Sequence, residues 1–176
     1  MVRLLAKTPC DGLLPLTIGA VTLAEIETGP IFSVSPFEGQ EKAVSNALKA
    51  SYGTALPAPN RTTSKGEARV IWSGRGQALM LGLVPQVSGA ALTDQSDAWC
   101  CVEIAGAGVE DVLARVTPID TGAMKRGHTA RTLVQHINVV LTRTGANRFE
   151  VMAMRSMAHT LVHDLERAMT GVAARG

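Results

Sequence analysis

Five segments between Asp97 and Met169 decide the fold: DAWCCVEIA (97–105), VEDVLARV (109–116), RTLVQHINVVLTR (131–143), RFEVMAM (148–154) and the helical run that begins at Ser156. The first, third and fourth segments are rich in β-branched and other apolar residues, which predicts extended strands. The second and fifth space their apolar residues as an amphipathic helix does. The predicted order is strand, helix, strand, strand, helix. This stretch holds no set of residues that could run a reaction, which favours a protein that functions while held against another.

The C-terminal helix is the strongest single prediction. One stripe of its surface carries Met157, Ala158, Leu161, Val162, Leu165 and Met169. An apolar stripe at this spacing is the side of a helix that packs on a core. Burying each large side chain contributes about 1.5–3 kcal/mol, so the helix is expected to dock on a sheet.

The N-terminal half also mixes strands and a helix. Strands are expected at 20–27 and 31–34, joined by Thr28-Gly29-Pro30, and a hairpin at 68–72 and 78–84. Between them, Ser35-Pro36-Phe37-Glu38 resembles a helix start and Gly53 a helix end. The expected helix carries Val44, Ala47, Leu48 and Ser51 on one face. Residues 56–66 are predicted to be a mobile loop.

These elements predict an α+β fold with antiparallel sheets in two ferredoxin-like split halves. Residues 1–16 are expected to be a loosely ordered lead-in segment. Residues 17–176 are expected to form a single compact domain, with a first half at about 17–92 and a second half at about 93–172.

The composition excludes several classes of protein. The chain has 176 residues, 46% of them hydrophobic and 18% charged, which is typical of a globular protein. A net charge of +2 is too small for a surface that neutralises phosphates, so a nucleic-acid partner is not expected. No apolar run is long enough to span a bilayer, and Leu13–Ala24 has no convincing signal-peptide cleavage site. A cytoplasmic protein without a membrane partner is expected.

The three cysteines do not form a disulfide or zinc pattern in the sequence. Cys100 and Cys101 are adjacent in a predicted strand, so their side chains should point to opposite faces. Cys10 stands alone near the N-terminus. We expect the pair in the strand to be small buried hydrophobic residues, in a reducing compartment.

Two motifs resemble a cofactor site or a metal site, but each lacks a residue that such a site requires. Gly106-Ala107-Gly108 stands between a strand and a helix, but Asp111 occupies the third glycine position of a dinucleotide loop, so a structural turn is favoured. His159 and His163 are four residues apart on the last helix, but Thr160 stands where a zincin has glutamate. A solvated or partner-contacting helix face is favoured over a metal site, and no metal or cofactor is expected in this chain.

The densest basic stretch contains Lys125, Arg126, His128 and Arg131. Such a run is usually a solvated loop, and in a subunit it can form the charged rim of an interface. The candidate partner interface is therefore Lys125, Arg126 and Arg131, together with the two histidines His159 and His163.

Several segments together resemble the gamma subunit of heterotetrameric sarcosine oxidase. They are ARVIWSGRGQALML (68–81), TDQSDAW (93–99), GAGVEDVLARVTPIDTGAM (106–124), ARTLV (130–134) and RSMAHTLVHDLERAM (155–169). The resemblance runs from about Val21 onward. It rests on the order and spacing of these segments. The chain departs from the family at Gly74–Ala78, where the family often has Gly-Pro-Asp-Glu-Trp, and at Ser96-Asp97, where it has Ser-His.

This resemblance implies a cytoplasmic bacterial complex that oxidatively demethylates sarcosine to glycine, forms hydrogen peroxide and passes the one-carbon unit to tetrahydrofolate. In that family FAD, FMN, NAD, zinc and folate belong to the alpha, beta and delta subunits. The gamma subunit is then an accessory chain that binds mainly alpha. The resemblance also implies a fold similar to the folate-binding domain of the glycine-cleavage aminomethyltransferases.

Two other functions stay open at this point. Those aminomethyltransferases carry a Gly-Gly turn and an aspartate in the region that corresponds to Thr132–Arg143, and this chain has neither there. Autonomous methyl transfer is therefore not expected, because acid-base chemistry requires a proton-accepting group in reach. The alternatives are a stand-alone folate-binding protein and a homodimeric structural module. Whether the isolated chain self-associates is left open.

Overall fold

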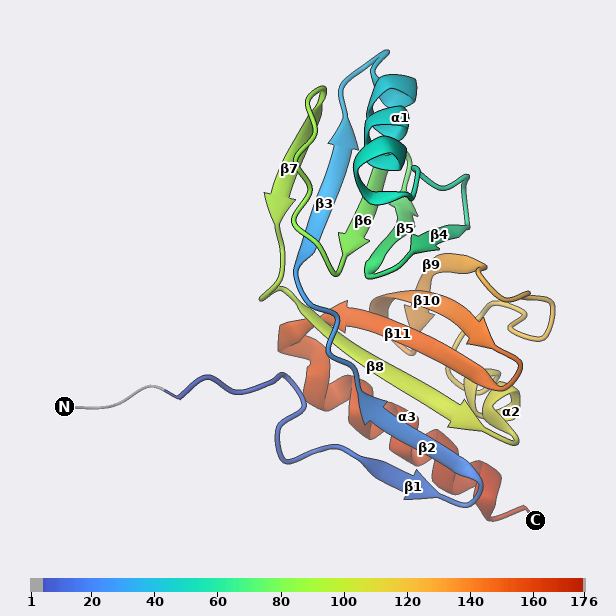
Figure 1. Cartoon of the computed structure of the whole chain (residues 1–176). Helices are drawn as coiled ribbons and strands as arrows, with labels where there is room; N and C mark the ends of the chain where they lie inside the picture. The colour runs from blue at the N-terminus through green and yellow to red at the C-terminus, as the bar shows by residue number, and fades with distance from the viewer. Residues whose placement is uncertain (1–4, 176) are drawn as a thin grey trace.

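The computed structural model describes residues 5–175 and shows an α+β fold with two antiparallel sheets, as predicted (Figure 1). The six-stranded sheet A has the order β1-β2-β8-β11-β10-β9, and the five-stranded sheet B has the order β4-β5-β6-β3-β7. The strands of sheet A are β1 (Leu16–Ile18), β2 (Val21–Glu25), β8 (Trp99–Gly106), β9 (Thr129–Val134), β10 (Ile137–Gly145) and β11 (Arg148–Met154). Those of sheet B are β3 (Ile31–Pro36), β4 (Thr62–Lys65), β5 (Ala68–Gly74), β6 (Gln77–Leu81) and β7 (Ala90–Asp94). The helices are α1 (Glu41–Tyr52), α2 (Val109–Leu113) and α3 (Ala158–Ala173), and a 3-10 turn at Arg155–Met157 leads into α3.

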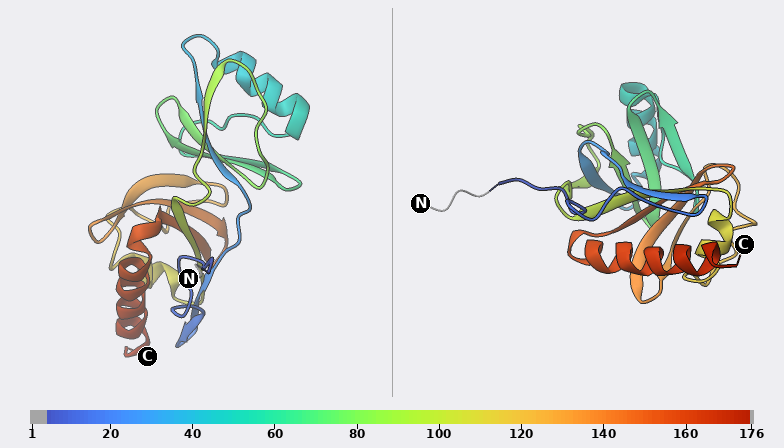
Figure 2. Two further views of the ribbon diagram at one scale, coloured as in Figure 1. Left: turned by 90° about the vertical axis from the view of Figure 1, so that its left-hand side faces the viewer. Right: turned by 90° about the horizontal axis from the view of Figure 1, so that it is seen from below.

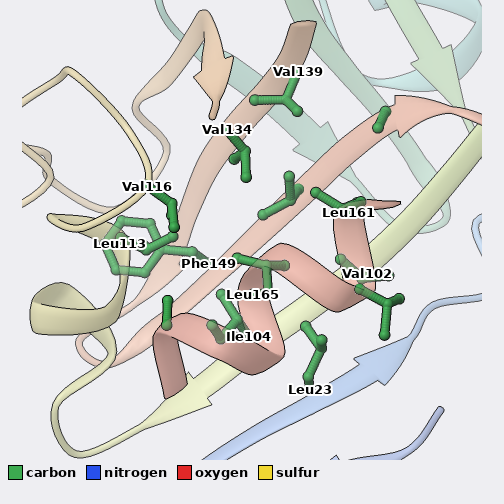
Figure 3. Packing of buried hydrophobic residues seen from close by; sticks show 14 of the residues in the cluster. Leu23, Val102, Ile104, Leu113, Val116, Val134, Val139, Phe149, Leu161 and Leu165 are labelled. Atoms are coloured by element: carbon green, nitrogen blue, oxygen red, sulfur yellow. The ribbon is translucent and has the colours of Figure 1, made fainter. Parts of the chain in front are cut away.

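Helix α3 covers one face of sheet A, and the predicted stripe is the side that it buries (Figures 1 and 3). Leu161 and Leu165 are fully buried against Ile104 of β8 and Phe149 of β11 in one continuous core. Along β8 the side chains alternate: Cys100 and Val102 belong to this core, whereas Trp99 and Cys101 belong to the opposite face. The prediction for this helix and for the two cysteines of β8 is confirmed.

Sheet B packs on the other face of sheet A (Figure 2). A second core joins the sheets and contains Ile31, Ile71, Leu79 and Leu81 from sheet B and Trp99, Cys101, Val140 and Met152 from sheet A. A partly buried ion pair also crosses the junction, from Arg69 of β5 to Glu150 of β11 at 2.6 Å. The far side of sheet B is covered by α1 through Val44 and Leu48.

The start of α1 differs from the prediction. Pro36 is the last residue of β3 and pairs with Ala90 of β7, so the chain remains extended where a helix was expected. The helix begins at Glu41 and ends at Tyr52, and it is capped by Gly53, whose positive φ of 71° suits glycine. The local signal at Ser35 is overridden because β7 supplies a strand partner that the sequence pattern does not reveal.

The two sheets do not follow the two halves of the sequence. Strand β2 pairs with β8 in sheet A, although β3 follows it after only five residues, at 26–30, and belongs to sheet B. The expected first half at 17–92 is therefore shared between the sheets. Within the described part of the expected lead-in segment, at 5–16, Cys10 is buried and Leu13 and Leu14 pack against the core of sheet A.

Loop and hairpin predictions had mixed outcomes. The hairpin of β5 and β6 is confirmed, but β4 lies within the expected loop at 56–66. The expected single extended segment at 131–143 is wrong: it is a hairpin of β9 and β10 that turns at Gln135-His136. Gln135 has a φ of 51°, and within residues 5–175 only Asn60 shares a positive φ among residues other than glycine. A turn without glycine left no signal in the sequence.

Replacing Gln135 with glycine is expected to raise the free energy of unfolding by about 0.5–1 kcal/mol. Positive φ costs an L-residue about 1–2 kcal/mol, and the extra freedom of glycine in the unfolded chain cancels part of this gain. Asn138→Gly, at an exposed position of β10, is the matched control and should lower the same quantity by about 0.5–1 kcal/mol. Urea unfolding at constant m-value measures both. A change of the same sign in the free energy of unfolding of both variants would contradict backbone strain at Gln135.

Candidate interface surface

The basic stretch predicted from the sequence lies on a loop that is attached to both sheets. The loop connects α2 to β9, and Gly127 is its junction: its N–H donates to Arg143 of β10, and its carbonyl accepts from Thr62 of β4. The next residue, His128, forms an isolated antiparallel bridge with Arg61. The loop is therefore held at the seam where β9 lies next to β4 and β5 (Figure 1).

The side chain of Arg143 holds this loop in place through hydrogen bonds. Its guanidinium donates to the carbonyl oxygens of Thr121 (3.2 Å) and Met124 (2.9 Å). It also donates to those of Gly145 (3.1 Å), the last residue of β10, and of Ala146 in the turn that follows. It also lies 5.1 Å from the centre of the Phe149 ring and 2.6 Å from the Glu110 carboxylate. The side chain is only 13% exposed, so its charge is used internally.

The remaining cations of the loop face solvent. Lys125 and Arg126 are exposed, and within residues 5–175 no carboxylate lies within ion-pair distance of either. The acid on the loop itself, Asp120, accepts a hydrogen bond from the Ala123 N–H and so points along the backbone. Partial desolvation lowers the pKa of His128, and the positive charges of Arg61 and Lys125 lower it further. We call Arg61, Lys125, Arg126 and His128 the basic surface.

Arg131 extends this surface along the edge of sheet A. It is exposed on β9, the last strand of the sheet, and its cross-strand partner is Val140. Val140 belongs to the core between the sheets, so Arg131 is on the same side of sheet A as sheet B. Leu133, two residues further, is 37% exposed on that side. A cationic loop next to an exposed apolar side chain is a composition suited to the rim of a protein interface.

The two histidines lie elsewhere. His159 and His163 are exposed on α3, which covers the face of sheet A opposite to sheet B. The structure therefore separates the five candidate residues into two surfaces. Among residues 5–175 no group of three histidine, cysteine, aspartate or glutamate side chains could hold a metal ion.

The glycines of the strand-to-helix turn are structural, as the sequence favours. Gly106 has a φ of 131°, and a Cβ built on it would lie 2.0 Å from the carbonyl oxygen of Ala20. Gly108 precedes α2, which has only five residues. This backbone makes a close turn against β2, and any larger residue at position 106 would separate the two strands.

An apolar hollow on sheet B is a further surface that the sequence did not reveal. It has a volume of about 390 Å³ and lies between α1, the turn of the β5–β6 hairpin and the segment after α1. Its apolar walls include Trp72, Leu56 and two prolines, Pro57 and Pro59. Apolar walls of this kind offer contact area to another molecule and few groups that could take part in catalysis.

Two residues of the basic surface and its support were missed by the sequence reasoning. Arg61 lies in the loop that was expected to be mobile, and it reaches His128 only because β4 and β9 are neighbours in space. Arg143 ends a predicted strand, where an arginine normally faces solvent. Neither residue has a local signal that could have identified its role.

The likeness to known proteins is one of structure. No family model and no curated protein matches the sequence. Among solved structures, a chain of heterotetrameric sarcosine oxidase from Corynebacterium sp. U-96, in complex with pyrrole 2-carboxylate, superposes with a TM-score of 0.81. The superposition covers 96% of this chain and 96% of that chain, at 20% sequence identity.

The two chains share one fold. This confirms the fold that the sequence resemblance implied. Because equal shares of both chains are covered, the matched chain is about as long as this one, and nearly all of each takes part in the likeness. Within residues 5–175 no helix is both long enough and apolar enough to cross a membrane.

Proposed function

We propose that this protein is a cytoplasmic accessory subunit, corresponding to gamma, of a sarcosine oxidase or of a related amine oxidase complex. The observation that carries the proposal is the whole-chain likeness to a chain of heterotetrameric sarcosine oxidase. The matched chain has about the length of this protein, which favours a small subunit over a domain of a larger one. The motifs that resemble the gamma subunit support the same assignment from the sequence.

The role we propose is structural and not catalytic. The related aminomethyltransferases carry a Gly-Gly turn and an aspartate in the region that corresponds roughly to Thr132–Arg143, and this chain has neither a glycine nor an acid there. A carboxylate that could accept a proton from a folate amine is therefore lacking at that position. In this proposal FAD, FMN, NAD, zinc and folate are held by alpha, beta and delta.

The basic surface and Arg131 form the contact with the large alpha subunit in this proposal. Their charges are exposed and not neutralised by neighbouring carboxylates, and the hydrogen bonds of Gly127 and Arg143 fix the loop that carries them. A fixed cationic surface selects a partner by charge complementarity and requires little ordering when it binds.

Replacing Lys125, Arg126 and Arg131 together with glutamine is expected to weaken association with the large subunit on the order of tenfold. The measurement is co-purification from cells that express all subunits, repeated at low and high salt. Wild-type association should weaken as salt rises, because salt screens exposed charges, and the variant should respond less. Glutamine at the exposed Lys42 and Lys49 of α1 and Lys65 of β4 makes the same charge change elsewhere and is the control. Unchanged assembly of the first variant would exclude the basic surface as an interface.

The proposed function itself is tested by what the chain binds. Purified alone it should be colourless, and from its native cell it should co-purify in constant ratio with flavin-bearing chains. Flavin bound to the isolated chain, or the absence of such partners, would overturn the proposal. Calorimetry with tetrahydrofolate distinguishes this proposal from the alternative. A stand-alone folate-binding protein would release or absorb heat when tetrahydrofolate is added, and a scaffold would not.

A further inference from the structure

Cys10 and Cys100 lie in contact although 90 residues separate them in sequence. Their sulfur atoms are 3.3 Å apart, with one thiol donating to the other, and both side chains are buried. Cys100 is in the central strand β8, on the face that α3 covers. Cys10 belongs to the N-terminal segment, and no pattern in the sequence predicts that this segment lies against β8. The sequence therefore hides a pair of thiols that only the fold brings together.

The backbone around Cys10 is held by few other contacts. The Cys10 N–H donates to Glu25 at the end of β2, and the Cys10 carbonyl accepts from Leu13 and Leu14 in a tight turn. Further toward the N-terminus, Lys7 is exposed and its carbonyl accepts from Arg155. Within residues 5–15, Cys10 is the one fully buried residue, and Leu13 and Leu14 are half-buried against the same core.

A cavity lies beside the segment that carries Cys10. It has a volume of about 280 Å³ and borders Thr8 and Pro9, the two residues before Cys10. Its walls also include Cys101, on the face of β8 opposite to Cys100, so an oxidant in this cavity reaches Cys10 only when Thr8 and Pro9 move. Movement of Thr8 and Pro9 would expose Cys10 without opening sheet A.

We propose that Cys10 and Cys100 are a redox-active dithiol whose oxidation to a disulfide fastens the N-terminal segment to the central strand. A hydroperoxide is the oxidant: Cys10 as thiolate attacks it to give a sulfenic acid, and the Cys100 sulfur displaces hydroxide from that sulfenic sulfur. The balance is two thiols and one hydrogen peroxide to one disulfide and two waters. The sulfur atoms need to approach from 3.3 Å to about 2.05 Å.

Closure of the segment controls the first step. The hydrogen bond to Cys100 and burial raise the pKa of the Cys10 thiol, so the closed state holds little thiolate. Oxidation therefore proceeds through the transiently open segment, and its rate should rise in urea too dilute to unfold the sheets. The inference goes beyond the proposed subunit role and does not depend on it.

Cys101 provides a matched control within the same strand. It is one residue from Cys100, but it faces sheet B and shares no contact with Cys10. Burial and the neighbouring Glu150 raise its pKa to about 12. Cys101 also lines the cavity beside Thr8 and Pro9, so an oxidant that selected cysteines by access alone would modify Cys101.

The test uses the full chain, reduced, freed of reductant and incubated with hydrogen peroxide. The three thiols should fall to one, and the intact mass should drop by about 2 Da, with a Cys10–Cys100 peptide in the digest. The melting temperature should rise by about 5–15 °C, because the cross-link closes a long loop. Amide hydrogen exchange at Leu13 and Leu14 should slow at least about tenfold, and exchange in α1 should not change.

Single variants assign the bond. Cys101→Ser should behave as wild type, whereas Cys10→Ser and Cys100→Ser should give no intramolecular disulfide. The peptide map of the wild-type chain does not rely on the folding of any variant. Persistence of all three thiols, a bond that includes Cys101, or a gain of oxygen without a disulfide would overturn the proposal.

Discussion

Arg143→Ala is expected to lower the free energy of unfolding by about 2–4 kcal/mol and to detach the loop that carries the basic surface. The guanidinium donates to four backbone carbonyls, two in the loop after α2 and two at the end of β10, those of Gly145 and Ala146. Alanine removes all of these donors together. Water can replace them only where the backbone is exposed, and the Thr121 side of the site is buried. Chemical denaturation measures the loss of stability, and hydrogen exchange of residues 120–128 measures the loosening of the loop.

Arg148→Ala is the matched control for this prediction. Arg148 lies on β11 and makes one ion pair, to Glu103 at 3.5 Å, with 57% of its side chain exposed. Exposed pairs of this kind contribute little, so its stability should stay within about 0.5 kcal/mol of wild type. Arg143→Lys keeps the charge but cannot reach four carbonyls, and it should fall between the two. Equal losses for Arg143→Ala and Arg148→Ala would contradict the anchoring role.

The fold was predictable from the sequence where the residue pattern within a single segment is enough to define the element. The α3 stripe and the alternation in β8 both follow from spacing in a single segment, and the structure confirms both. Strand β2 could not be placed in this way. Its local pattern is equally suited to either sheet, and it joins β8 because that partner, 75 or more residues away, completes the core above α3.

The candidate site shows the same limit. The basic residues at 125–131 were recognisable as a cluster from sequence, but their rigidity was not. It depends on Gly127 contacting both Thr62 and Arg143, which come from different sheets. Likewise, Cys10 and Cys100 gave no pattern, because the spacing rules for cysteine describe short local motifs and not pairs made by tertiary packing. Sequence identifies chemical groups, whereas the packing of sheet A determines which of them meet.

Leu165→Ala is expected to lower the free energy of unfolding by about 2–5 kcal/mol. Leu165 is fully buried in the middle of α3 and points into the core between Ile104 and Phe149 (Figure 3). Its truncation leaves a cavity below the two central strands, which cannot collapse without moving the hydrogen-bonded sheet. Urea denaturation measures the effect, and His163→Ala, on the exposed face of the same helix, should stay within about 0.5 kcal/mol of wild type.

This pair of variants also separates stability from assembly. If α3 serves only to complete the core, Leu165→Ala should reduce co-purification with partner subunits in proportion to its loss of folded protein, and His163→Ala should leave it unchanged. The Lys125, Arg126 and Arg131 variant should do the opposite, losing the partner at unchanged stability. A loss of partner in His163→Ala at full stability would instead place an interface on the outer face of α3, where His159 and His163 lie. The basic surface would then be at most one of two contacts, on opposite sides of sheet A.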